Sequence, residues 1–178
     1  MRCLLAAWLL FAGSVWADTL QGVVIVVIDG DTVLFKPDHY HPVSRAFLKV
    51  RLAGIDAPEA AQQHGEAATR ALKEMALKQR ARLEIVATEH YGRQLGRLSV
   101  GTLAVNAELV RRGHAWAYGS PRPSAHRGSD PARTSSRAAG DALPALQNEA
   151  QYARRGLWRD AAPVAPWIWR RAQTTSAY

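Results

Sequence analysis

The chain is almost free of cysteine: Cys3 is the only one among its 178 residues, and it lies close to the N-terminus. If an N-terminal export signal is removed, the mature chain holds no thiol, which excludes disulfide bonds as a source of stability. Cys3 is also too early to be the cysteine that a lipoprotein carries at its cleavage site. Histidine pairs with zinc-ligand spacing are lacking too, and His39 and His41 lie in a polar loop, where histidine is usually solvated. Zinc is therefore a poor fit.

The chain also lacks a hydrophobic run long enough to cross a membrane. Arg2 precedes an apolar run over residues 4–12, which is shorter than the roughly 20 residues that a spanning helix needs. Val15 and Ala17 follow at the positions where signal peptidase requires small side chains. We therefore expect residues 1–17 to be a cleaved signal peptide rather than an anchor. The mature protein is then exported, to the periplasm or outside the cell, without stable membrane insertion.

Acidic residues are scarce beside basic ones, with 15 Asp and Glu against 23 Lys and Arg, a net charge of +8 and a pI near 10.2. A strongly basic exported domain is attracted to polyanions such as nucleic acid, anionic lipid or acidic glycans. The charge can equally serve solubility alone, so it does not choose among these partners. The length fits one domain with its own core, which we place at residues 18–170, followed by a disordered tail over 171–178.

The distribution of β-branched and turn residues predicts short strands. Asp29-Gly30 is a strong hairpin-turn signal between two runs of β-forming residues. In a later strand, Lys49 and Arg51 alternate with apolar residues, so their side chains are expected to point away from the core. The expected strands are 22–28, 32–36, 46–52, 83–86 and 94–100, with a further short one ending at Val105.

Three helices are predicted between and after these strands. Residues 66–79 contain neither Gly nor Pro and place apolar residues at helical spacing, which predicts an amphipathic helix. Asn106 is expected to cap a short helix that stops at Gly113. Pro144 suits the first turn of a last helix, closed by Gly156. Five strands and three helices predict an α+β fold, a small five-stranded β-barrel with helical cover.

Residues 121–140 contain almost nothing to bury. The segment is dense in proline, serine and glycine and carries four arginines, which predicts a mobile basic loop. The arginines can follow a phosphate backbone electrostatically. A disordered insertion without a role explains the composition equally well, so the function of this loop stays open.

Two short segments of the chain carry carboxylates that could bind one cation. An Asp-Gly pair in a hairpin is usually only a turn, so Asp31 in Asp-Gly-Asp proves little by itself. Asp56 and Glu59, however, flank Pro58 at the end of a strand, where the proline helps to hold a tight exposed loop. Neighbouring carboxylates repel unless a cation lies between them. Calcium takes roughly 6 to 8 oxygens, so two aspartates, a backbone carbonyl, waters and a substrate phosphate would complete its shell.

Two arginines accompany these carboxylates. Arg51 and Arg93 can be ordinary surface charges, but a planar, permanently protonated guanidinium best matches the charge that develops on a phosphate during displacement. Tyr91-Gly92-Arg93 has the composition of a turn that displays its arginine. Two carboxylates for a hard cation, a third to activate water and two guanidinium groups are the inventory for hydrolysing a phosphodiester.

The same segments, in the same order, resemble the staphylococcal nuclease (thermonuclease) family over about residues 20–170. The tail, with Pro166-Trp167 and then Arg170, is similar to that of exported bacterial members. The matching segments are VIDGDT at 27–32, VRLAGIDAPE at 50–59, GEA at 65–67, YGRQL at 91–95, VNAELV at 105–110 and GLW at 156–158. Their number and order make the resemblance specific.

This resemblance implies an OB-fold barrel capped by helices and a monomeric, sugar-nonspecific nuclease. It further implies that one calcium ion is required, that DNA and RNA are both hydrolysed by water, and that 3′-phosphate ends result. By position, the metal ligands are Asp31, Asp56 and the backbone carbonyl of Ala57, the general base is Glu59, the phosphate-binding arginines are Arg51 and Arg93, and the substrate contacts are Tyr91 and Tyr118.

Two departures from the family pattern concern phosphate binding. Glu89-His90 precedes Tyr91 where the best-known member has an aspartate and a lysine, and the stretch from Glu59 to Gly65 is too short for that member's basic loop. Two other functions stay open. The fold also serves as a noncatalytic nucleic-acid-binding module, usually after the acidic and arginine positions are lost, whereas all five are present here. The second is that of a cationic envelope protein that contacts lipid or wall polymers, and only the net charge supports it.

Overall fold

The structure, a computed structural model, describes residues 19–39, 47–118 and 142–175. The expected signal peptide, residues 1–17, and the expected basic loop, residues 121–140, lie outside the described residues. Within the described ranges, none of the helices has the length and apolarity that a membrane crossing requires.

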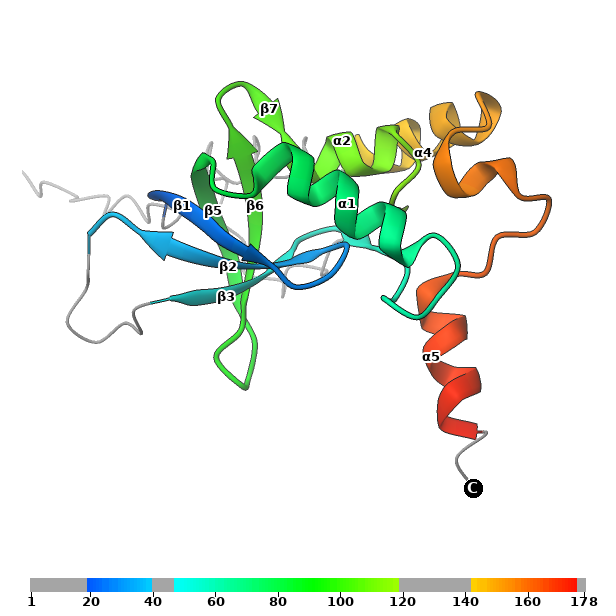
Figure 1. Cartoon of the computed structure of the whole chain (residues 1–178), viewed down its shortest axis with the longest axis horizontal. Helices are drawn as coiled ribbons and strands as arrows, with labels where there is room; N and C mark the ends of the chain where they lie inside the picture. Colours follow the sequence, from blue (N-terminus) through cyan, green and yellow to red (C-terminus); the bar gives the residue numbers. More distant parts are fainter. Residues whose placement is uncertain (1–18, 40–46, 119–141, 176–178) are drawn as a thin grey trace, which may run out of the picture.

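A closed five-stranded barrel forms the centre of the fold (Figure 1), as the sequence predicts. Antiparallel pairing joins the strands in the order β3-β2-β1-β5-β6, and a parallel pairing of β3 with β6 closes the barrel. Closure leaves no long strand edge open to other chains. The strands are β1 (Thr19–Val27), β2 (Thr32–Pro37), β3 (Leu48–Leu52), β5 (Arg80–Thr88) and β6 (Gln94–Val100).

Three short strands complete the sheets. β7 (Leu103–Ala104) pairs with the end of β6, and β4 (Ile55–Asp56) pairs with β8 (Trp116–Ala117). Val105 was expected to end a strand, but it begins a helix instead. The β4–β8 pair places the end of the β3–β4 turn next to a segment that comes much later in the chain.

The strands fill the barrel by the alternation that their sequences predict. In β3, Val50 and Leu52 are buried, while Lys49 is exposed and Arg51 is half-buried. Burying each such aliphatic side chain is worth about 1.5–3 kcal/mol. The other large side chains that the barrel strands bury completely include Val24, Val33, Phe35, Leu83 and Leu98.

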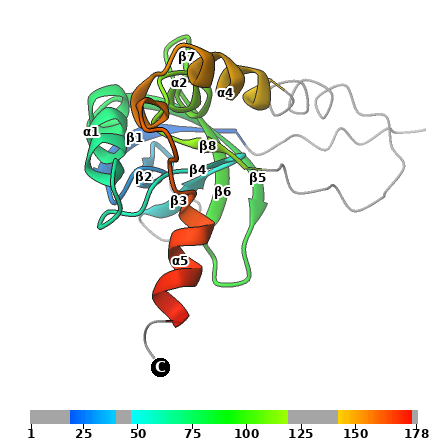
Figure 2. The same cartoon turned by 90° about the vertical axis from the view of Figure 1, so that its right-hand side faces the viewer.

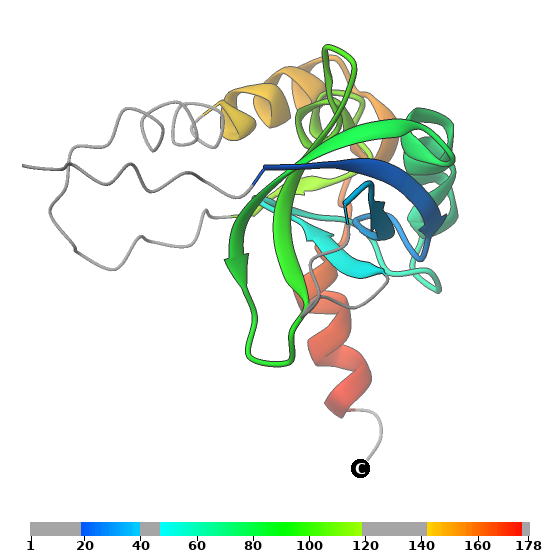
Figure 3. The same cartoon turned by 90° about the vertical axis from the view of Figure 1, so that its left-hand side faces the viewer.

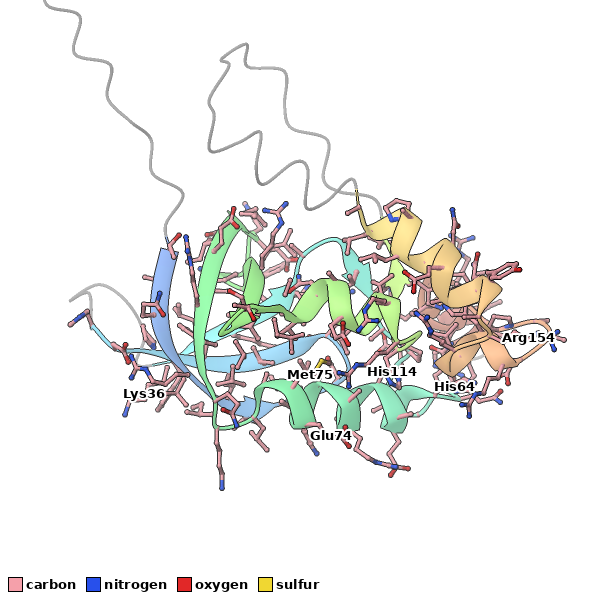
Figure 4. All side chains as sticks on the ribbon, turned by 90° about the horizontal axis from the view of Figure 1, so that it is seen from above. Lys36, His64, Glu74, Met75, His114 and Arg154 are labelled. Atoms are coloured by element: carbon pink, nitrogen blue, oxygen red, sulfur yellow. The ribbon has the colours of Figure 1, made fainter. Side chains whose placement is uncertain are left out.

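Helices cover one side of the barrel, as Figure 3 shows in a view turned by 90° from that of Figure 1. Helix α1 (Gly65–Ala76) is amphipathic, and Figure 4 shows Met75 directed into the interior and Glu74 directed outward. Helix α2 (Val105–Arg111) packs on α1 and on α4 (Leu143–Tyr152). Pro144 stands in the first turn of α4, as expected.

Helix α1 ends at Ala76 and not at residue 79, where the sequence pattern places its end. Leu77 is extended, and Lys78 has a left-handed backbone with φ of 60°. The backbone N–H of Lys78 donates a hydrogen bond to the carbonyl of Val24 at 2.7 Å. This contact with β1 turns the chain into β5, so tertiary structure overrides the local helical pattern.

Asn106 is not the N-cap of α2, which is Ala104; it lies within the helix and is buried. Its Nδ2 donates to the carbonyl of Ala53 at 2.9 Å, and its Oδ1 accepts from the backbone N–H of Leu98 at 3.0 Å. Asn106 therefore joins α2 to β6 and to the turn after β3. Gly113, by contrast, ends the helical region with φ of 72°, as expected.

The chain does not end its regular structure with α4. A 3₁₀ turn, η1 (Gly156–Arg159), follows, and then helix α5 (Pro166–Thr175). Residues from 171 were expected to be a disordered tail, but α5 continues through Thr175. Figures 1 and 2 show that α5 starts beside the barrel and extends away from it.

Candidate active site

Two aspartates from different parts of the chain lie together under one arginine. Asp31 stands just before β2 and Asp56 is in β4, and they are only 3% and 1% exposed. Arg51 of β3 donates from Nη1 to Asp31 Oδ1 at 3.1 Å and from Nη2 to Asp56 Oδ1 at 2.6 Å. Because one guanidinium spans both contacts, the two carboxylates lie within reach of a single small cation.

Local backbone structure fixes the position of Asp31. In the β2–β3 ladder, Thr32 is paired with Arg51, which brings Asp31 to the end of β3. Asp31 Oδ2 accepts a hydrogen bond from the backbone N–H of Ala57 at 3.0 Å. Gly30 permits this approach, since a Cβ there would lie 2.7 Å from the Cβ of Ala57. The glycine of the Asp-Gly-Asp turn is thus needed for close packing of the two acidic loops.

Burial raises the pKa of Asp31 to about 6, although Arg51 and the N–H of Ala57 act in the opposite direction. The charge of Asp29 adds to the rise. A carboxylate removed from water is costly to ionise unless positive charge is close by. Positive charge close to Asp31, from Arg51 or from a bound cation, therefore favours its ionised form.

Glu59 is linked to Asp56 by a second arginine, Arg170 of α5. Arg170 donates from Nη2 to Asp56 Oδ2 at 2.8 Å and from Nη1 to Glu59 Oε1 at 2.6 Å. Hydrogen bonds to Asp56, the larger influence, and to Glu59 raise the pKa of Arg170. The Glu59 side chain is 38% exposed, so solvent reaches it. Arg51 and Arg170 together therefore bring Asp31, Asp56 and Glu59 into one cluster.

Arg170 is the member of this cluster that residue-by-residue reasoning about the site missed. The signal was in the sequence, since Arg170 follows Pro166-Trp167 in a tail with family resemblance. Because that tail resembles the tail of exported bacterial members, its arginine could have been considered as a site residue.

Arg93 lies apart from the aspartate pair. In the described part of the chain its hydrogen bonds go to Glu89, from Nε to Oε2 at 2.7 Å and from Nη2 to Oε1 at 3.0 Å. This pairing raises the pKa of Arg93 and lowers that of Glu89. The charges of Asp31 and Asp29 also help to raise the pKa of Arg93. Arg93 is therefore within electrostatic reach of the carboxylates without touching them.

The two expected substrate tyrosines lie in different segments of the fold. Tyr91 is exposed in the β5–β6 turn, where its ring meets the edge of His90. Tyr118 is exposed just after β8, and its ring centre is 5.6 Å from that of Trp167 in α5. Because Trp116 of β8 is paired with Asp56 of β4, Tyr118 lies near the acidic cluster.

Comparison with known proteins identifies the relatives of this chain. The family model described as staphylococcal nuclease homologue matches residues 49–160. An uncharacterized endonuclease of Escherichia coli O157:H7 is 35% identical over 162 residues, covering 90% of this chain and 92% of that protein. The chain belongs to the staphylococcal nuclease family. It is accordingly a hydrolytic nuclease, with nucleic acid as its substrate.

Two further relatives cover nearly the whole chain. The micrococcal nuclease of Shigella flexneri is 31% identical over 185 residues, covering 97% of this chain and 92% of that protein. Protein ParB of Escherichia coli is 38% identical over 174 residues, covering 93% of this chain and 86% of that protein. The similarity therefore extends on both sides beyond residues 49–160, which the family model matches.

The staphylococcal nuclease family is generally metal-dependent, and the donors present here fit a hard cation. Among the described residues, no three His, Cys, Asp or Glu side chains form a metal-binding group. A cation here would depend on Asp31 and Asp56, with backbone, water and substrate oxygens for the rest. An all-oxygen set of this kind suits calcium or magnesium rather than zinc. The carbonyl of Ala57 stays a predicted ligand, since the contact with Asp31 is made by its N–H.

Proposed function

We propose that this nuclease is calcium-dependent, hydrolyses the phosphodiester bonds of both DNA and RNA, and leaves 3′-phosphate ends. The observation that carries the proposal is the pair of buried aspartates joined by Arg51, with Glu59 beside them. Calcium in particular is favoured by the resemblance, and its shell of roughly 6 to 8 oxygens can be completed by a backbone carbonyl, waters and substrate oxygens beside the two aspartates.

One calcium ion is held by Asp31, Asp56 and the carbonyl of Ala57. When bound, it supplies positive charge that stabilises the phosphate as negative charge builds up during displacement. Burial is the main cause of the raised pKa of Asp31, because it deprives the ionised carboxylate of stabilisation by water. A bound cation would supply that stabilisation, which supports this assignment.

Glu59 accepts a proton from a water molecule that attacks phosphorus in line with the departing 5′ oxygen. The new bond joins the water oxygen to phosphorus, the bond from phosphorus to the 5′ oxygen breaks, and the 5′ oxygen gains a proton from solvent. The 3′ oxygen keeps the phosphate. The solvent access of Glu59 and its place beside Asp56 support this role.

Arg51 and Arg93 stabilise the charge on the phosphate oxygens. Both are permanently protonated, and a fixed guanidinium interacts most strongly with the crowded transition state. The Arg93 guanidinium uses Nε and Nη2 on Glu89, which leaves Nη1 outside that ion pair. Tyr91 and Tyr118 provide exposed rings that bases or sugars can contact without sequence preference.

The protein acts as a monomer outside the cytoplasm. Residues 1–17 have the charge, apolar core and small-residue pattern of a cleaved signal peptide. A nuclease without cysteine in its mature chain is also suited to an oxidising compartment, where free thiols would form unwanted disulfides.

The proposal is tested by incubating the purified mature protein with single-stranded DNA, double-stranded DNA and RNA, in calcium and in chelator. We expect cleavage of all three in calcium only, with phosphate on the 3′ ends. Glu59→Gln should cut about 10² to 10⁴ times more slowly, because the positioned base is lost. DNA retention without cleavage would instead indicate a noncatalytic binding protein, and a Glu59→Gln variant with parental activity would refute the role of Glu59.

A further inference from the structure

Helix α5 is attached to the body of the protein at its first turn. Ala165 and Pro166 are buried, and the ring centre of Trp167 is 5.5 Å from that of Trp116 in β8. Just before the helix, the carbonyl of Val164 accepts a hydrogen bond from Gln62 Nε2 at 2.6 Å. The start of α5 is thus fixed against β8 and against the loop that follows Glu59.

This attachment determines where Arg170 lies. Arg170 follows Trp167 by three residues, so both side chains lie on the same face of α5. Its guanidinium crosses from Asp56, contacted at 2.8 Å, to Glu59, contacted at 2.6 Å. A third contact, 3.2 Å long, joins Nη1 to Asp56 Oδ1. The fork therefore bridges a predicted metal ligand and the predicted general base.

The two carboxylates depend on Arg170 to different degrees. Asp56 keeps Arg51 on Oδ1, but in the described part of the chain the hydrogen bond to Oδ2 comes from Arg170. Glu59 has its backbone N–H bonded to Gln62 Oε1 at 3.2 Å, which fixes the main chain and not the carboxylate. The described side-chain contact of the Glu59 carboxylate is with Arg170. Without it, Glu59 is free to rotate and is repelled by the charge of Asp56.

We propose that Arg170 is a positioning residue of the active site, delivered by α5, which holds the carboxylate of Glu59 beside Asp56 in the orientation needed to accept a proton from water. The inference rests on the proposed function, in which Glu59 is the base. Helix α5 then contributes a residue to the nuclease site as well as packing against β8 at its first turn.

The test compares Arg170→Ala and Arg170→Lys with Arg171→Ala. Arg171 is the next residue of the same helix, and within the described residues its side chain has no hydrogen bond or ion pair, so it controls for charge and helix propensity. We measure kcat and KM on single-stranded DNA in calcium. Arg170→Ala should lower kcat about 10- to 100-fold with KM within about twofold, as expected when a reacting group loses its orientation. Arg170→Lys should retain part of the rate, and millimolar guanidinium ion should restore part of it to Arg170→Ala.

A calcium titration by calorimetry without DNA provides a second readout. Removing the guanidinium takes positive charge away from Asp56, so Arg170→Ala should bind calcium more tightly than Arg171→Ala does. A residue with a merely structural role would weaken calcium binding, lower Tm and raise KM together, and that combination would overturn the proposal.

The outcomes separate this inference from the function on which it rests. If the parental protein does not cut nucleic acid in calcium, the proposed function fails and the role of Glu59 fails with it. If the parental protein cuts, and Arg170→Ala matches Arg171→Ala in kcat, only the positioning role is refuted. Equal calcium affinities of these two variants would likewise refute it, because they would show that Arg170 does not act on Asp56.

Discussion

At the scale of single residues, Arg51 holds the acidic site together. Its two nitrogen contacts, 3.1 Å to Asp31 and 2.6 Å to Asp56, offset the repulsion of two nearly inaccessible carboxylates. Ion pairs of this kind contribute little net stability when intact, but removing one partner leaves buried charge without compensation. Arg51 therefore serves the fold as well as the proposed chemistry.

Arg51→Ala should lower the free energy of unfolding by about 2–3 kcal/mol in chelator, less than for a fully buried pair because Arg51 is partly exposed. Saturating calcium should recover much of this loss, since a cation between the aspartates replaces the missing charge. Urea unfolding with chelator and with calcium measures both effects.

Arg80→Ala is the matched control for that experiment. Arg80 is largely exposed and pairs with Asp38 at the surface, so its removal should cost under about 1 kcal/mol. Calcium should change its stability no more than that of the parental protein. Equal losses for the two variants would contradict the role given to Arg51.

The members of the acidic cluster could be predicted from the sequence, because turn and strand signals and the family resemblance single them out, although their convergence depends on the fold. Strand alternation turns Arg51 away from the core, and the turn signal at Asp29-Gly30 places Asp31 at a strand end. Arg170 could not be placed in this way, since 111 positions separate it from Glu59 and only the folded chain brings them together. The pairing of Arg93 with Glu89 was likewise unforeseen, because it depends on the shape of the β5–β6 turn.

At the scale of elements, the strands were easier to predict than the ends of the helices. Alternating burial is a property of each strand by itself, whereas α1 stops where Lys78 meets β1. Helix α5 was missed because its attachment depends on Trp167 and on buried residues just before it, not on a long apolar face of its own. Elements whose stability comes from tertiary contacts leave a weak local signal.

Two glycines join the end of α2 to η1. Gly156 has φ of 52°, and a Cβ there would lie 2.2 Å from the carbonyl oxygen of Gly113. The same oxygen accepts a hydrogen bond from the N–H of Leu157 at 2.9 Å. The contact requires a residue without a side chain, and it positions the chain that leads to α5.

Gly156→Ala should therefore destabilise the protein by about 2–4 kcal/mol, which combines left-handed backbone strain with displacement of the Gly113 carbonyl. Gly101→Ala separates these causes, because Gly101 has φ of 57° and no atom of the described residues lies within 4 Å of a Cβ there. Its cost should be only about 1–2 kcal/mol. Thermal or urea unfolding of both variants measures the difference, and equal costs would show that the close contact is unimportant.

At the scale of the whole molecule, barrel closure explains how distant acidic segments meet. The β3–β6 pairing fixes one side of the barrel, and the β4–β8 pair fixes Asp56 beside it. Helix α5 then reaches back to the same place from the C-terminal end of the chain (Figure 2). The barrel itself followed from strand number and turn signals, whereas this convergence required the complete fold.

Calorimetric titration of calcium into the metal-free mature protein shows whether Asp31 and Asp56 share one divalent cation. We expect one ion per chain, bound at least about tenfold more weakly by Asp31→Asn and by Asp56→Asn. Asp38→Asn, which among the described residues alters the ion pair with Arg80 alone, should bind like the parental protein. Calcium binding that both site variants retain at parental affinity, or a parental protein that binds no calcium, would show that Asp31 and Asp56 do not share a cation.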